Sequence, residues 1–263
     1  MIFTTFHFFE ISQPYNIAFF KTFFKFNTRI FLKELDKTIF RKYILSGNAN
    51  KLKYKGIKMA KILFFGDSIT ALRKNIVVAS EMIALKYPLH TIVNKGVGGN
   101  DTNLAKTRFA ADVLAEKPDL VIFSFGCNDA AIDVWKGKTS PRLTIEEYTT
   151  NLTFFIDEVR KQGGKLIFFT PPPMVLVEGL KPYYGGEPYL SNGFNFMIDQ
   201  FIAAAKKLMA EKEISVVDVN TIFRKAAAND DELVKLLPDG MHPNSEGQQL
   251  IFDGLCKAID NIL

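Results

Sequence analysis

The stretch KILFFGDSIT, residues 61–70, decides the fold of this chain. Its apolar run from Ile62 to Phe65 is typical of a strand that is buried on both faces, and the run stops at Gly66-Asp67-Ser68. Glycine lets the backbone turn sharply, so we place Ser68 in a turn between a strand and a helix. A serine in that position has two interpretations, since it can cap the helix that follows or be presented for reaction.

Similar short apolar runs recur beyond Met59, separated by longer helical patterns. The sequence predicts five strands, at 62–65, 91–93, 120–125, 166–169 and 216–219. It predicts amphipathic helices near 71–86, 102–116, 145–162, 194–212 and 245–262. This β-α-β-α order predicts an α/β fold with a five-stranded parallel sheet covered by helices on both faces.

Two connections in this pattern are unusually long. Residues 126–144 follow the third predicted strand, and residues 170–193 follow the fourth. Open parallel sheets bind their ligands at the carboxyl ends of the strands. We therefore expect these two segments to form the walls of a site.

The composition fits one sizeable folded domain, with 48% hydrophobic and 23% charged residues among 263. The net charge of +5 comes from residues 1–58, which hold 11 Lys and Arg against 3 Asp and Glu. Residues 59–263 hold 22 against 25, so we expect no nucleic-acid partner for the main body. Cys127 and Cys256 have neither CxxC spacing nor a paired framework, which favours a reducing compartment and argues against metal ligation.

Residues 1–58 differ in kind from the rest and hold 11 of the 25 phenylalanines. Their opening, MIFTTFHFFE, has no basic region and reaches Glu10 early, which is unlike a secretory signal, so we expect a cytoplasmic protein. Two interpretations stay open. In the first, translation starts at Met59 and residues 1–58 are upstream read-through. In the second, residues 18–31 form a basic amphipathic arm that brings the protein to a membrane surface.

A candidate acid–base pair lies near the end of the chain, in LPDGMHPNSEGQQL. Asp239 precedes His242 by three residues, so its carboxylate can accept the Nδ1 proton and leave Nε2 facing a nucleophile. Pro243 disfavours helix at His242 and keeps the pair in a loop. His90 has no acidic neighbour and His7 lies in the doubtful extension. The alternative is that Asp239 only makes a local turn and His242 is a surface residue.

Two further turns could supply hydrogen-bond donors to an oxyanion. NKGVGGND, after the second predicted strand, allows close backbone approach at Gly98 and Gly99, and FGCND, after the third, carries the Asn128 amide. The glycine turn fails the GxGxxG pattern because Asp101 stands where the last glycine would be, which disfavours a dinucleotide site. Cys127 could be a nucleophile, but as a small apolar residue beside a strand it is expected to be buried.

Together these blocks resemble the SGNH hydrolases, also called the GDSL esterase/lipase family. The first block is Gly66-Asp67-Ser68-Ile69, with Ile in place of the Leu of the family name. The glycine of the second block corresponds to Gly99, GxND to Gly126-Cys127-Asn128-Asp129, and DxxH to Asp239-Gly240-Met241-His242. No single block is specific, but all four occur in order, over about residues 59–263.

The resemblance implies a flavodoxin-like three-layer α/β/α domain at 59–263, without metal or cofactor, that hydrolyses esters through an acyl-serine intermediate. It implies that Ser68 is the nucleophile, His242 the base and Asp239 the residue that orients His242. The oxyanion hole would consist of the Ser68 and Gly99 backbone N–H groups and the Asn128 amide. Ser68 would then both start a helix and act as nucleophile.

The sequence leaves the substrate and the oligomeric state open. Tyrosines and glycines in KPYYGGEPYL can stack on a sugar ring, which favours small-acyl (acetyl) esters of carbohydrates. A lysophospholipase or thioesterase remains an alternative. So does a non-catalytic module that binds a nucleotide or another ligand.

Overall fold

The computed structural model describes residues 59–263. Both interpretations of residues 1–58, read-through and amphipathic arm, lie outside the described residues. None of the helices in the described part has the length and apolar character needed to cross a membrane.

The core of the fold is one sheet of five parallel strands in the order β2-β1-β3-β4-β5. The strands are β1 (Lys61–Gly66), β2 (Thr91–Gly96), β3 (Leu120–Ser124), β4 (Lys165–Phe169) and β5 (Ser215–Val217). This is the strand order of flavodoxin-like doubly wound folds. The predicted α/β class with a five-stranded parallel sheet is confirmed.

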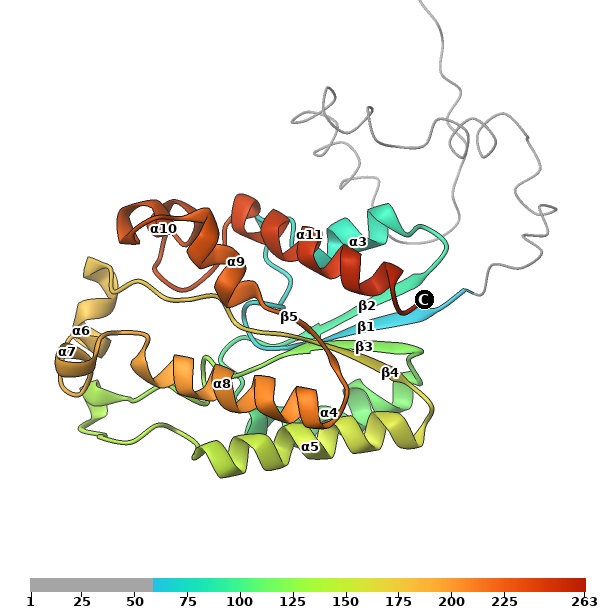
Figure 1. The fold of residues 1–263 in the computed structure, drawn as a ribbon, viewed down its shortest axis with the longest axis horizontal. Helices are drawn as coiled ribbons and strands as arrows, with labels where there is room; N and C mark the ends of the chain where they lie inside the picture. Colours follow the sequence, from blue (N-terminus) through green and yellow to red (C-terminus); the bar gives the residue numbers. More distant parts are fainter. Residues whose placement is uncertain (1–58) are drawn as a thin grey trace, which may run out of the picture. The chain divides into compact units, whose positions relative to one another are not determined.

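Alternate residues of β1 enter two separate hydrophobic cores. Leu63 and Phe65 pack in the core beneath α4, α5 and α8, whereas Ile62 and Phe64 pack in the core beneath α3, α9 and α11. Figure 1 shows these two helical layers on opposite sides of the sheet. The bounds are α3 (Ala79–Lys86), α4 (Thr102–Asp112), α5 (Ile145–Lys161), α8 (Phe196–Glu211), α9 (Val219–Ala226) and α11 (Ser245–Asp260).

The first helix was predicted at 71–86, and its predicted start is wrong, because α3 begins only at Ala79. The β-branched run Ile76-Val77-Val78 disfavours helix, and the Val78 N–H donates to Glu81 Oε2 at 2.9 Å, which fixes the entrance to α3 there. Ser68 therefore lies ten residues outside any helix cap, within a turn. The expectation that Ser68 starts a helix is wrong.

The segment after β5 also differs from the prediction. The strand expected at 216–219 ends at Val217 because the Asp218 carboxylate accepts the Thr221 N–H at 3.1 Å and caps α9. A second short helix, α10 (Asp230–Leu236), is capped by Asn229, whose side chain accepts the Glu232 N–H. Neither helix was predicted.

Short helices occupy the two long connections. They are η3 (Val134–Lys136) after β3, and η4 (Glu178–Leu180), α6 (Lys181–Tyr184) and α7 (Tyr189–Asn192) after β4. Figure 1 shows α6 and α7 at the end of the molecule toward which the strands run. These connections thus lie at the carboxyl edge of the sheet, as expected for the walls of a site.

Two glycines let the Ser68 turn approach the strand ends. A Cβ at Gly66 would lie 2.2 Å from Thr70 Oγ1, and a Cβ at Gly96 would lie 2.4 Å from the Ala71 backbone nitrogen. Real side chains essentially never come so close, and a backbone atom cannot move aside cheaply. Both strand ends therefore need glycine for residues 67–71 to fold back over them.

We expect Gly96→Ala to lower the free energy of unfolding by about 1–3 kcal/mol, the usual cost of overpacking. Gly179→Ala is the matched control, because a Cβ there meets nothing within 4 Å. Urea unfolding of both variants measures the difference. Equal midpoints for the two would mean that the Ser68 turn adapts without strain.

Candidate active site

Ser68 lies at the carboxyl end of β1, in a turn that Asp67 organises. The Asp67 side chain accepts the Ile69 N–H at 2.9 Å, and its backbone oxygen accepts the N–H groups of Thr70 and Ala71 at 3.2 and 3.0 Å. Asp67 is buried, whereas Ser68 is half-buried. The turn thus places the Ser68 side chain at the surface of the carboxyl edge.

Three side chains from opposite ends of the chain form a line of hydrogen bonds. His242 Nε2 lies 2.9 Å from Ser68 Oγ, and His242 Nδ1 lies 2.7 Å from Asp239 Oδ2. A carboxylate only accepts, so Nδ1 carries the proton and Nε2 is left to accept the Ser68 hydroxyl. This arrangement can activate a serine oxygen as a nucleophile.

The loop that carries Asp239 and His242 is held in place on several sides. Asp239 Oδ1 accepts the N–H groups of Met241 and His242 at 3.0 and 2.7 Å. Burial raises the pKa of Asp239, but these bonds and the His242 side chain outweigh burial and lower it overall. Gly240, at φ +82°, lies against Val175, whose N–H donates to the Gly240 oxygen at 2.8 Å.

Asn128, half-buried after β3, has an amide whose orientation is fixed by three neighbours. Its Nδ2 donates to the Asn100 oxygen at 3.1 Å and approaches Asp67 Oδ2 at 3.4 Å, while its Oδ1 accepts from Arg142 Nη1 at 3.4 Å. A flipped amide would set its oxygen against two other oxygens. The donor side of Asn128 therefore faces the Ser68 turn.

The glycine turn after β2 also lies beside Ser68. A Cβ at Gly98 would be 3.9 Å from Ser68 Cβ, and Gly99 takes φ +75°, which favours glycine. Arg108 on α4 ties this turn to the strands. It donates to Asn100 Oδ1, the Lys95 oxygen and the Gly66 oxygen at 2.7, 2.8 and 3.0 Å.

Two carboxyl groups are buried behind these residues. Burial, with the nearby Asp129, raises the pKa of Asp67 to about 7, against the opposing hydrogen bonds from Ile69 and Asn128. Burial raises the pKa of Asp129 to about 6, although Thr102 donates to it from both N–H and hydroxyl. Cys127 is buried as expected, and burial raises the pKa of its thiol, which disfavours the reactive thiolate.

The raised pKa of Asp67 predicts a pH dependence of stability. The folded state holds the proton up to about pH 7, whereas the ordinary value is 3.8. The free energy of unfolding therefore falls as pH rises from about 4 to about 7, on the order of 4 kcal/mol for a three-unit shift. We expect Asp67→Asn to flatten this decline in unfolding curves at pH 5 and pH 8, and the exposed-site control Glu246→Gln to keep it. A slope equal to that of the wild type would contradict the assignment.

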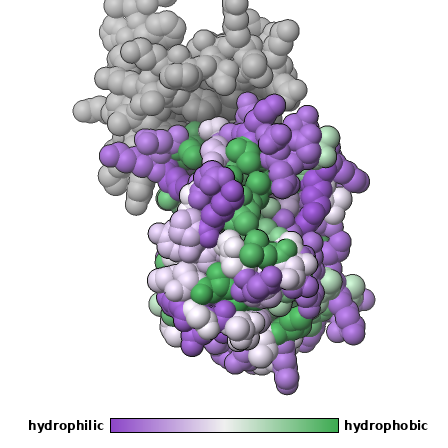
Figure 2. Space-filling view, turned by 90° about the vertical axis from the view of Figure 1, so that its left-hand side faces the viewer, coloured by the Kyte–Doolittle hydropathy of each residue, from purple (hydrophilic) through white to green (hydrophobic). Residues whose placement is uncertain are grey.

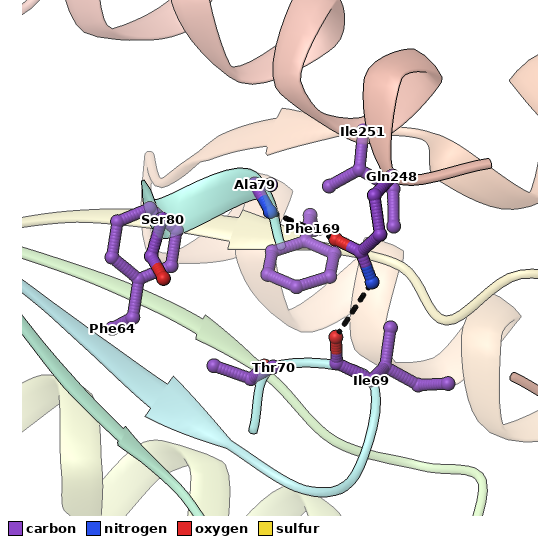
Figure 3. A pocket seen from close by; sticks show the side chains of 8 residues that line it. All are labelled: Phe64, Ile69, Thr70, Ala79, Ser80, Phe169, Gln248 and Ile251. Atoms are coloured by element: carbon purple, nitrogen blue, oxygen red, sulfur yellow. Dashed lines mark hydrogen bonds between the residues drawn. The ribbon is translucent and has the colours of Figure 1, made fainter. Parts of the chain in front are cut away.

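A water-sized cavity lies on the inner side of the Ser68 turn, between β1, α3 and α11. Figure 3 shows Gln248 at this cavity, where it donates to the Ile69 oxygen at 3.2 Å and accepts the Ala79 N–H at 2.9 Å. The cavity is too small for a substrate. Its role is structural, because Gln248 ties the helix after His242 to the segment after Ser68.

Residues 64–250 match the sequence profile of the GDSL-like Lipase/Acylhydrolase family. The chain belongs to this family. It is therefore a GDSL-type, or SGNH, carboxylic ester hydrolase, and its substrates are esters.

This GDSL-family hydrolase is similar to proteins with several different names. The chain is 32% identical over 183 residues to an uncharacterized lipoprotein of Bacillus subtilis (62% of this chain, 71% of the relative). It is 27% identical over 223 residues to an acetylxylan esterase of Geobacillus stearothermophilus (76% and 93%). The crystal structure of a lipase/acylhydrolase from Enterococcus faecalis has 26% identity and a TM-score of 0.61, covering 77% of this chain and 96% of that one.

The structure thus brings most of the residues singled out in the sequence to one edge of the sheet. Ser68, Asp239 and His242 are in contact, and Asn128 and the Gly98-Gly99 turn surround the same region. Sequence reasoning missed Arg108 and Arg142. No local motif marks these arginines, because Arg108 donates to strand ends and turns far along the chain, and Arg142 donates to residues 9 and 14 positions earlier in an irregular connection.

Proposed function

We propose that this hydrolase cleaves esters through an acyl-serine intermediate. The observation that carries the proposal is the line of contacts from Asp239 through His242 to Ser68. Ser68 Oγ attacks the ester carbonyl while its proton passes to His242 Nε2. The bond to the alcohol then breaks, and His242 returns the proton to the leaving oxygen. Water then attacks the acyl-serine in the same way, with His242 taking its proton and returning it to Ser68 Oγ, and the acid is released.

The oxyanion formed in each step needs donors that are already in place. We assign this role to the backbone N–H groups of Ser68 and Gly99 and to Asn128 Nδ2. The position of the Gly98-Gly99 turn and the fixed orientation of the Asn128 amide support the assignment. Asp239 holds His242 in the required tautomer and stabilises its protonated form.

For the substrate we propose small-acyl esters, above all acetyl esters of carbohydrates. The acetylxylan esterases among its relatives support this choice. So do the aromatic residues of the two long connections, which can stack on sugar rings.

The first test is labelling with a fluorophosphonate followed by peptide mapping. We expect one label per folded chain, on Ser68, and none in Ser68→Ala. Labelling of Cys127 would contradict the mechanism. Undiminished turnover by Ser68→Ala would favour a non-catalytic binding module contaminated by another esterase.

The second test is a hydrolysis panel of p-nitrophenyl esters from C2 to C12, run beside acetylated xylotriose. We expect kcat/KM to be highest for the acetyl ester and the acetylated sugar to be cleaved. A maximum at the long acyl chains would instead identify a lysophospholipase or thioesterase-type hydrolase.

A further inference from the structure

An aromatic pair lies exposed on the two long connections. Trp135 on η3 and Tyr183 on α6 are 52% and 48% exposed, and their ring centroids lie 5.8 Å apart at 90°. Trp135 is the only tryptophan of the chain. Lys136 Nζ lies 4.4 Å from the centre of the Trp135 ring. The pair thus joins the connection after β3 to the connection after β4.

The pair is linked to the candidate oxyanion donor through a buried charge. Asp133, directly before η3, is 8% exposed and binds Arg142 through Nη2 at 2.8 Å and Nε at 3.3 Å. The hydrogen bond from Arg142 lowers the pKa of Asp133 and keeps it ionised. Arg142 Nη1 reaches Asn128 Oδ1 at 3.4 Å. The connection that carries Trp135 is therefore anchored beside Asn128.

The connection after β3 is also held by residues of α7. The Ile132 N–H donates to the Tyr189 hydroxyl at 2.8 Å, which joins it to α7. The Tyr184 ring stacks edge-on against Tyr189, with centroids 5.7 Å apart. Trp135 and Tyr183 are thus exposed rings on connections that a hydrogen bond and ring packing hold together.

Figure 2 looks onto this end of the molecule and shows hydrophobic surface gathered in a broken band, with hydrophilic residues on both sides. Arg142 adds hydrogen-bond donors beside the aromatic pair, because 30% of its side chain is exposed. A guanidinium has five N–H donors, and Asp133 and Asn128 accept from three of them. A sugar ring matches this combination. Its C–H face packs on aromatic rings, and its hydroxyls accept hydrogen bonds from a guanidinium.

We propose that Trp135, Tyr183 and Arg142 form a subsite that holds a sugar ring on the alcohol side of the scissile ester. The subsite deepens the proposed function and rests on it. The acyl group lies at Ser68 and Asn128, and the sugar extends from there over Arg142 toward the aromatic pair. The subsite selects the alcohol and leaves the acyl chemistry to Ser68 and His242.

The single tryptophan provides a direct binding test. In the full-length Ser68→Ala protein, titration with xylotriose should change the Trp135 emission in a saturable way. Tyr183→Ala in the same background should weaken the apparent affinity by about tenfold, the value of one aromatic contact. Decanoate serves as the competing probe. Saturation by decanoate but not by xylotriose would show that the aromatic pair holds an acyl chain, and would overturn the proposal.

Kinetics test the same subsite in the active enzyme. Trp135→Ala should lower kcat/KM for acetylated xylotriose about tenfold more than kcat/KM for p-nitrophenyl acetate, chiefly through KM. Leu190→Ala is the matched control, since Leu190 is a 66% exposed apolar residue outside the subsite, on the connection after β4 that also carries Tyr183. It should leave both substrates unchanged. Equal loss on both substrates in Trp135→Ala would overturn the subsite.

The two proposals fail separately. If the wild type cleaves acetylated xylotriose but the emission does not respond to xylotriose, the subsite is wrong and the carbohydrate esterase stands. If the emission responds but only p-nitrophenyl esters are cleaved, the aromatic pair binds a sugar, but the acetylated sugar is not the substrate and the place of the subsite on the alcohol side of the ester is overturned. If neither occurs, both are wrong.

Discussion

His242→Ala is expected to lower kcat by about 10⁴- to 10⁶-fold, the loss typical of an essential residue in a serine hydrolase triad. Within residues 59–263, His242 is the side chain that contacts Ser68 Oγ and is in position to take its proton. Steady-state hydrolysis of p-nitrophenyl acetate measures the effect. The melting temperature should change little, because His242 is half-buried in a loop that other bonds hold.

Asp239→Asn is the companion variant and should cost less than His242→Ala. Asparagine keeps an oxygen for the Met241 and His242 N–H groups but offers the wrong partner to Nδ1. Some turnover should therefore persist, at a reduced rate, because the imidazole of His242 is then in the wrong orientation or the wrong tautomer. Near-wild-type rates for both variants would remove the pair from the mechanism.

Asn128→Ala is expected to lower kcat by about 10²- to 10³-fold with KM nearly unchanged, the usual result of losing one oxyanion donor. The charge that this amide stabilises exists in the transition state and not in the bound ester, so the loss appears in kcat.

Thermal melting separates this loss from general damage around Asn128. Asn192→Ala is the matched control, because Asn192 is exposed on α7 and its amide donates to the nearby Pro188 oxygen. A collapse of stability together with activity would assign Asn128 to packing. A kcat within a few-fold of the wild type would contradict an oxyanion role.

The sheet could be predicted from the sequence because its signal is local. Each strand is a short apolar run, and burial on both faces makes runs such as Ile62–Phe65 continuous. The start of α3 and the helices α9 and α10 could not be predicted in the same way. α9 and α10 have eight and seven residues, too few for a periodic pattern, and side-chain caps at Asp218 and Asn229 define them.

The residues of the candidate site also fall into those with a local signal in the sequence and those without one. Ser68 and the Asp239–His242 pair carry local signals, a sharp turn after a strand and a carboxylate three residues before an imidazole. Arg108 and Arg142 carry none, because neither arginine stands at a periodic spacing from the oxygens that it contacts near the site. The exposure of Trp135 and Tyr183 likewise depends on how two long connections meet, which composition does not encode.

The contact between Ser68 and His242 spans 174 residues of sequence, and Arg73 donates to the Pro243 oxygen across a similar separation of 170. During synthesis the first of these segments leaves the ribosome long before the second. Under the proposed mechanism, the nascent chain carries a nucleophile without its base until residue 242 has been added. A product that terminates between these two residues is therefore expected to be inactive on esters.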